Sequence, residues 1–277
     1  MFKPVSSYAL VICGLALAWP VEAANGAATQ SIPDFTGFWQ HGVPGQQYDK
    51  PPSGPGPVRR IGVPEDYTPN LNWRGDDKNP ILQPWAAEAV RKEWERESKG
   101  LPELSPFTTC RPAGVPFVLS FLRPMQILQT PNKVFFHYQF NQQSRAVHMN
   151  VPHSKTLKPS YYGESVGHYE GDTLVVDTIG MNDKTWTDRF ATPHTEKLHV
   201  VERYRLIDAG KTLEVFFTVT DPGAFTTPWS GIVKYPRVPG EKIQEEVCAE
   251  NNTFHGITVP VAEIDPISGE KFPESRE

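Results

Sequence analysis

The chain of 277 residues carries 27 Lys and Arg against 32 Asp and Glu, a net charge of −5. No basic cluster is longer than Arg59-Arg60, which argues against nucleic acid as a partner, and no basic amphipathic helix offers itself to a membrane surface. Hydrophobic residues make up 38% of the chain and include 15 Phe, 9 Tyr and 7 Trp, enough for the core of one large β domain or two small domains.

The first residues have the pattern of an export signal. Lys3 precedes an apolar stretch from Tyr8 to Trp19, and the small-x-small motif Val21-Glu22-Ala23 follows. This stretch is too short for a bilayer, which needs roughly 20 apolar residues, and a lipoprotein signal ending at Cys13 would leave almost no signal. We therefore expect residues 1–23 to be a signal peptide and the mature protein to be periplasmic or secreted.

Removal of this signal leaves two cysteines, Cys110 and Cys248. Because two thiols in an oxidising compartment allow one intramolecular pairing, we expect a Cys110–Cys248 disulfide. A metal pair or a redox couple is the alternative, but the two cysteines are far apart in sequence and lack a CxxC spacing.

Residues 24–82 are rich in Pro and Gly, notably over residues 51–57. Since proline fixes φ and removes a hydrogen-bond donor, we expect an irregular segment here, with a short aromatic strand at Phe35–Trp39. Residues 83–100 are expected to form a helix, because an apolar stripe that includes Trp85, Ala89 and Trp94 lies opposite charged residues.

Beyond Phe117 the pattern changes to alternating strands rich in Val, Phe, Tyr and Thr, separated by turn residues. Residues 101–260 are therefore predicted to form an antiparallel β domain, followed by a C-terminal tail over residues 261–277. A meander this long usually closes to remove its edges, which favours a calycin or lipocalin-like barrel, with a two-sheet sandwich as the alternative. The predicted strands are Met125–Thr130, Val134–Phe140, Ala146–Asn150, Tyr162–Tyr169, Thr173–Thr178, Glu196–Leu206, Thr212–Thr220, Trp229–Tyr235 and Lys242–Cys248.

One connection is much longer than the others. Residues 179–195 contain no clear strand, and loops this long in a compact domain are usually functional or disordered. This loop contains the polar residues Lys184, Asp188 and His194 together with Trp186. It is either a binding or catalytic loop, or an Ω-loop whose polar groups satisfy its own backbone.

Two strands carry charged residues where a core face is expected. Alternation places Glu202 on the same face as Val200 and Tyr204, and an inward carboxylate must be paired, protonated or active. A structural pair with an arginine such as Arg145 is the alternative.

The strand Tyr162–Tyr169 shows a similar pattern, because Glu164 and His168 share a face with Tyr162. Glycines mark the opposite face, so that either face could point inward.

Motifs for cofactor chemistry are absent from the sequence. It has no HxH or HExxH spacing, no GxGxxG and no phosphate loop. We therefore expect no cofactor. A metal ion bound by residues of separate strands remains an open alternative, because such ligands cannot be identified from sequence.

The segment Ser165–Thr178, with its Glu170-Gly171-Asp172-Thr173-Leu174-Val175-Val176 core, continues into Trp186, Asp188, Pro193-His194-Thr195 and Glu202-Arg203. This pattern resembles an uncharacterised family of secreted bacterial proteins, over about residues 35–252. Tyr169 stands where Trp is usual in that family, and Thr195 where Ser is usual. The resemblance implies export and no particular activity.

These observations favour an exported, cofactor-independent enzyme that acts by acid–base chemistry on a small apolar or aromatic organic molecule. The reaction would be an elimination, isomerisation or hydrolysis. His194 is expected to be the general acid or base, Asp188 to orient it, and Glu202 to be the second carboxylate. The expected substrate-binding residues are Arg145, Tyr162, Glu164, His168, Lys184, Trp186 and Tyr204.

The competing hypothesis is a lipocalin-like carrier that binds an apolar molecule without catalysis. The enzyme hypothesis predicts that His194→Ala abolishes function, whereas His199→Ala does much less, because alternation places His199 on the outer face of its strand. The sequence does not indicate an oligomeric state.

Overall fold

The computed structural model describes residues 32–41, 47–61, 74–101, 103–251, 253–254 and 257–258. The expected signal peptide and C-terminal tail lie outside these residues, as do parts of the Pro/Gly-rich segment. No helix within the described ranges is long and apolar enough to cross a membrane.

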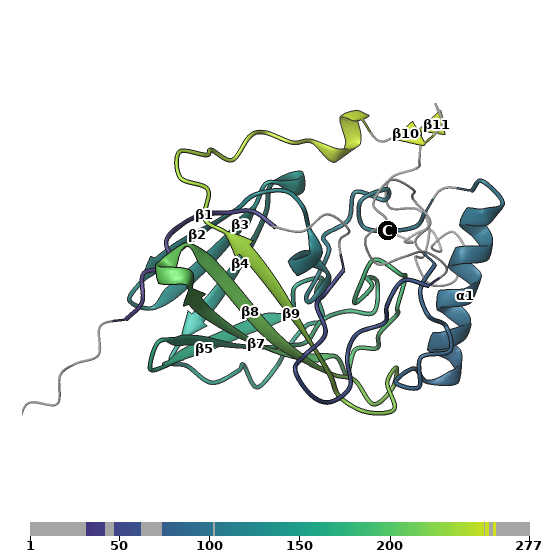
Figure 1. Cartoon of the computed structure of the whole chain (residues 1–277), viewed down its shortest axis with the longest axis horizontal. Coiled ribbons are helices and arrows are strands. Elements are labelled where there is room, and N and C mark those ends of the chain that lie inside the picture. Colours follow the sequence, from purple (N-terminus) through teal and green to yellow (C-terminus); the bar gives the residue numbers. More distant parts are fainter. Residues whose placement is uncertain are drawn as a thin grey trace, which may run out of the picture. The chain divides into compact units, whose positions relative to one another are not determined.

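Nine strands form one sheet in the order in which they occur along the chain, from β1 to β9 (Figure 1). The strands are β1 (Gly37–Trp39), β2 (Met125–Thr130), β3 (Lys133–Tyr138), β4 (Gln143–Met149), β5 (Glu164–Glu170), β6 (Thr173–Ile179), β7 (His199–Ile207), β8 (Thr212–Thr220) and β9 (Trp229–Pro236). A two-stranded sheet of β10 (Thr253–Phe254) and β11 (Ile257–Thr258) follows. Short 3-10 helices span Phe117–Ser120, Phe140–Gln142, Asp208–Gly210 and Cys248–Asn251.

The two ends of the sheet meet and nearly close it into a barrel, as the sequence predicts. Trp39 at the end of β1 forms a bridge with Arg237, just beyond β9. The Gln40 amide donates to the Pro236 carbonyl at 3.1 Å, and the Val238 amide donates to the Phe38 carbonyl at 3.0 Å. This closure removes the exposed sheet edges that an open meander would leave.

Inward side chains fill the barrel with a period of two. On β8, Leu213, Val215, Phe217 and Val219 are all fully buried, and the residues between them are partly exposed. Because successive side chains of a strand point to opposite faces, this alternation fixes which residues reach the interior. Fully buried large side chains such as Phe136 occupy the core.

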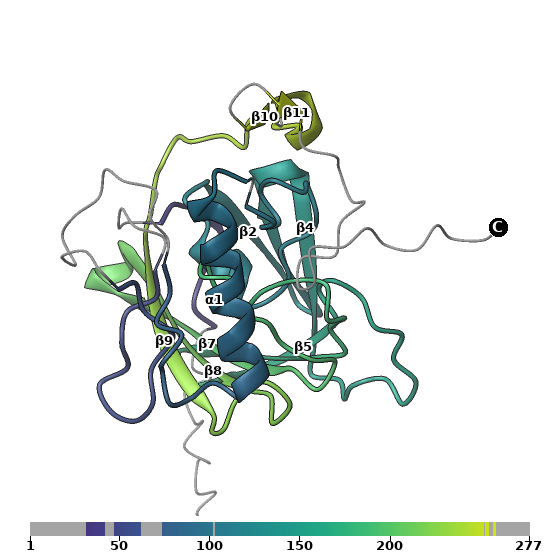
Figure 2. The same cartoon turned by 90° about the vertical axis from the view of Figure 1, so that its right-hand side faces the viewer.

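One α-helix, α1 (Pro84–Ser98), lies in front of the barrel in the view of Figure 2. Its first turn begins with a proline, which suits a position with no intrahelical partner for the amide. The helix is tied to the β8–β9 connection, where the Gln83 amide donates to the Ala224 carbonyl at 2.8 Å. Ala86 and Val90 are its buried apolar residues, in agreement with the predicted helix over residues 83–100.

The structure departs from the predicted antiparallel meander in one strand pair. β4 and β5 are parallel and pair over only three positions, from Val147–Ser165 to Met149–Gly167. A parallel pair needs a connection that returns along the sheet, and residues 150–163 provide it. The first half of β4 consequently has no partner on the β5 side.

The predicted strand Lys242–Cys248 is wrong, because this segment is irregular up to the 3-10 helix at Cys248. Its alternating residues meet no free sheet edge, since β9 is already covered by residues 38–40 and by Asp49, which bridges Ile232.

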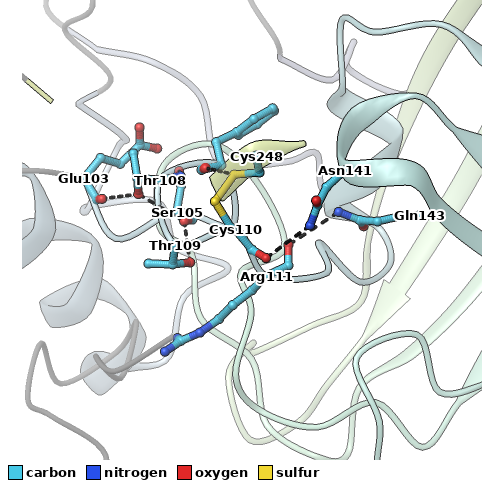
Figure 3. Close-up of a disulfide and its surroundings, with 10 residues drawn as sticks. Glu103, Ser105, Thr108, Thr109, Cys110, Arg111, Asn141, Gln143 and Cys248 are labelled. Carbon is cyan, nitrogen blue, oxygen red and sulfur yellow. Dashed lines mark hydrogen bonds between the residues drawn. A yellow bond between two sulfur atoms is a disulfide. The ribbon is translucent and has the colours of Figure 1, made fainter. Parts of the chain in front are cut away.

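A disulfide joins Cys110 to Cys248, as predicted (Figure 3). The two Cα atoms lie 5.5 Å apart, a usual separation for a bridged pair. The Asn141 side-chain amide donates to the Cys110 carbonyl at 3.3 Å, so the bridge sits beside the turn between β3 and β4. It fastens the C-terminal segment to the connection between β1 and β2.

Candidate functional site

A buried ion pair lies inside the barrel. The Arg145 guanidinium donates to both carboxylate oxygens of Glu202, one of them at 2.9 Å, and neither side chain is more than 1% exposed. Glu202 thus points inward, as alternation on its strand predicts. Its partner is Arg145, and the sequence analysis gave a structural pair with this arginine as the alternative to a catalytic Glu202.

Hydroxyl groups complete the surroundings of this pair. Arg145 also donates from Nε to Ser165 at 2.9 Å and from Nη2 to Thr178 at 2.7 Å. The Tyr204 hydroxyl donates to Glu202 at 2.6 Å. Burial opposes the charge on Arg145, but the adjacent Glu202 raises the arginine pKa well above its usual value, so the pair stays ionised. The arrangement satisfies both charges and is therefore structural.

Residues of the long loop provide the hydrogen-bond partners of both His194 ring nitrogens. The His194 ring contacts the Thr185 hydroxyl through Nε2 at 2.8 Å and the Thr195 carbonyl through Nδ1 at 3.1 Å. Only 1% of the residue is exposed. Burial lowers the pKa of His194, which keeps the imidazole neutral near pH 7.

Asp188 holds the turn of the same loop and does not orient His194. Its Oδ1 accepts hydrogen bonds from the Phe190 amide at 2.8 Å and the Thr192 amide at 3.3 Å. Burial raises the pKa of Asp188 to about 6. Within the described residues, no hydrogen bond joins Asp188, His194 and Glu202 to one another, so the expected catalytic trio is not assembled.

The remaining predicted residues of the loop and of β5 lie in different surroundings. Trp186 is 1% exposed and packs in the core against Phe117, with ring centroids 6.4 Å apart. Lys184 is exposed on the loop. His168 is exposed on the outer face of β5, where it contacts Glu170 at 3.1 Å.

A cavity of about 350 Å³ lies at the opening between β4 and β5. Three predicted substrate-binding residues line it: Arg145, Tyr162 and Glu164. The other lining residues, which the sequence did not single out, are Ser144, Ala146, His148, Gly163 and Ser165. The cavity follows from the short β4–β5 pairing, because the unpaired half of β4 contributes Ser144, Arg145 and Ala146.

Next to this cavity, four ionisable side chains form a chain of contacts across the outer face of the sheet. His153 Nδ1 lies 3.1 Å from Glu164 Oε2, and His153 Nε2 lies 2.9 Å from Asp177 Oδ1. His199 Nε2 lies 3.0 Å from the same Asp177 oxygen. The outward position of His199 agrees with the sequence, whereas the role of His153 and Asp177 depends on a loop returning to the sheet, which no local pattern shows.

No group of three or more His, Cys, Asp or Glu side chains within the described ranges could hold a metal ion. No protein-family model matches the sequence, and no curated protein is detectably similar to it.

Replacing His194 by alanine is expected to lower the free energy of unfolding by about 1–3 kcal/mol, because the buried Thr185 hydroxyl would lose its partner. His199→Ala is expected to change it by less than about 1 kcal/mol, since that residue is partly exposed. Urea unfolding of both variants measures the difference. Wild-type stability in His194→Ala, together with a lost activity, would instead favour the catalytic role that the sequence predicts.

Proposed function

We propose that the protein is an exported β-barrel that binds a small polar organic molecule in the β4–β5 cavity. The cavity itself carries this proposal, because its lining combines Arg145 and Ser165 of the buried polar network with polar residues of the outer face. Clefts with a few convergent polar groups are the usual sites for small ligands. The signal-like first residues and the disulfide support export.

The lining sets the chemistry of the ligand. The lining residues include Ser144 with its hydroxyl, His148 with its imidazole and Glu164 with its carboxylate. Its volume of about 350 Å³ is near the lower end for small-molecule sites. These features favour a compact ligand with hydroxyl or carboxylate groups rather than a largely apolar one.

One wall of the cavity is aromatic. The Tyr162 ring is stacked nearly parallel to the Tyr138 ring, with an interplanar angle of 3° and centroids 6.4 Å apart. Its hydroxyl donates to the Gln143 side chain, which fixes the ring in place. A rigid ring at the wall suits a planar or aromatic ligand body.

Catalysis at the same cavity is the second candidate, and His148 is the observation that favours it. No side-chain hydrogen bond or ion pair of His148 is found within the described part of the chain, and an imidazole can both accept and donate a proton near neutral pH. His148 pairs with Val166 on β5, and Glu164 lies two residues before Val166 on the same strand, so that His148 and Glu164 share one face of the sheet. The chemistry would be cofactor-independent proton transfer, with His148 in the role first expected of His194.

Substituting Ala146 by tryptophan tests the site, because Ala146 lines the cavity from the outer face of β4 and an indole there would fill it. We expect ligand affinity to fall by about tenfold or more. Leu128→Trp is the control, since Leu128 is exposed on β2 outside this cavity.

Ligand-observed NMR with mixtures of small hydroxylated and carboxylated aromatic compounds measures binding to the wild type and both variants. Equal binding by wild type and Ala146→Trp would reject the site. New product signals that grow with time in the wild-type sample would favour the enzyme over the carrier.

A further inference from the structure

The connection between β4 and β5, residues 150–163, is held to the sheet at two places. Its first half is held at His153 by the four contacting side chains described above, and its end is held at Ser160 by backbone hydrogen bonds with Gly180 and Asn182. We call His153, Glu164, Asp177 and His199 the latch. The Ser154 amide also donates to Glu164 at 2.7 Å, and the Ser154 hydroxyl bonds to the same carboxylate. The connection ends in Tyr162 and Gly163, which line the β4–β5 cavity.

The number of protons on the His153 ring decides whether both of its contacts in the latch are hydrogen bonds. Its two ring nitrogens each face a carboxylate oxygen, at 3.1 Å and 2.9 Å. A carboxylate that is ionised only accepts hydrogen bonds, and a neutral imidazole has a single N–H to donate. Both contacts are therefore hydrogen bonds only when His153 carries two protons and a positive charge.

The acidic partners are ionised over most of the pH range. The hydrogen bond from His199 lowers the pKa of Asp177 despite partial burial, and His153 adds to this effect. Slight burial opposes the ionisation of Glu164, but the hydrogen bonds from Ser154 and His153 lower its pKa overall. Their stabilising contribution is present above their unfolded values of about 4 and is lost as the pH falls through the folded values.

The histidine side of the latch has the opposite pH dependence. The hydrogen bond to Asp177 raises the pKa of His199, against the effect of partial burial. Its contribution is complete below the unfolded value of about 6.5 and is lost as the pH rises through the folded value. The two dependences together make the latch strongest in mildly acidic solution.

We propose that the latch is a pH-sensitive gate, which holds the β4–β5 connection closed in mildly acidic solution and releases it in alkaline solution. Its effect on ligand access rests on the function proposed above, whereas its opening is a property of the protein without ligand. An imidazole with a single ring proton can donate to only one of the two carboxylates, which then face each other with one proton donor between them.

The charged groups around His153 come from three strands and its own loop. Glu164 on β5 and Asp177 on β6 contact it directly, and His199 on β7 contacts Asp177. Lys155 and Lys158 belong to the same connection and are exposed. Since Lys155 precedes a threonine, trypsin can cleave there when the connection opens.

Two measurements on the ligand-free protein test the gate. The first is hydrogen exchange at the Ser154 amide, corrected for intrinsic exchange, between about pH 5.5 and about pH 8.5. The second is tryptic cleavage after Lys155 at one fixed pH, compared between variants. His153→Gln removes the charge, and His168→Gln is the control, because His168 is exposed on the same face of β5 and contacts Glu170 instead.

We expect protection of the Ser154 amide to fall by about 10- to 100-fold from the acidic to the alkaline condition. His153→Gln should show lower protection than the wild type in the acidic condition and faster cleavage, while His168→Gln should follow the wild type. Protection that stays constant over this range, or an equal change in both variants, would overturn the gate. Ligand binding that is absent in the wild type would count against the proposed function alone.

Discussion

Replacing Arg145 by methionine is expected to lower the free energy of unfolding by about 3–5 kcal/mol, because it leaves the Glu202 carboxylate buried without its countercharge. Glu202 is fully buried, and its remaining contact is the Tyr204 hydroxyl. Urea or thermal unfolding of the purified variant measures the loss. The loss expected from Arg145→Met is larger than the loss of about 1–3 kcal/mol expected from His194→Ala.

Two further variants show whether the loss comes from the broken pair. The double change Arg145→Met with Glu202→Leu removes both charges, and replacing a buried pair by apolar residues is often neutral, so most of the stability should return. Arg205→Met breaks the exposed Arg205–Glu214 pair, 2.8 Å long, and should cost less than about 1 kcal/mol. A loss in Arg145→Met no larger than in Arg205→Met would show that the buried pair contributes little.

The strands of the barrel could be predicted because their signal is local. Thr212–Thr220 and Met125–Thr130 were predicted with the bounds that the structure shows, since alternation and the turn residues at their ends are properties of neighbouring positions. The parallel pairing of β4 with β5 was not predicted. Strands after a long connection can return in either direction, and the alternation of a strand is the same in both.

The candidate site was only partly predictable. Inward alternation identified Glu202, and its pairing with Arg145 was an open alternative, because both lie on regular strands. The long loop was misleading, since its buried polar residues bond to the loop itself, as Asp188 does with the amides of Phe190 and Thr192. The contacts of His153 depend on where residues 150–163 cross the sheet, which is a tertiary property.

The same strand pair connects the fold to the proposed function. Arg145 and Ser165 belong to the closed polar network of the interior and also line the β4–β5 cavity. That network fixes the side chains of Arg145 and Ser165, and the hydrogen bond to Gln143 fixes the Tyr162 ring, so this part of the cavity lining is rigid.

Removing the disulfide with the double variant Cys110→Ser and Cys248→Ser is expected to lower the free energy of unfolding by about 2–5 kcal/mol. The bridge links residues 138 positions apart, so it restricts a long loop of the unfolded chain. The segment before Cys248 is otherwise held by few contacts, such as the Arg123–Glu246 pair at 3.0 Å, in which Arg123 is more than half exposed.

This arrangement predicts where the loss appears first. A cavity of about 750 Å³ is lined by residues of the segment 241–250 on one side and by Phe107 and Phe140 among others, whereas the barrel is closed independently by the pairing of Trp39 with Arg237. Amides of residues 241–250 should therefore exchange faster in the double variant, while those of β7 and β8 stay protected in native conditions. Hydrogen exchange with mass spectrometry measures both regions, and thiol counting confirms the bridge in the wild type. Equal loss of protection in β7, β8 and the C-terminal segment would show instead that the bridge stabilises the barrel as a whole.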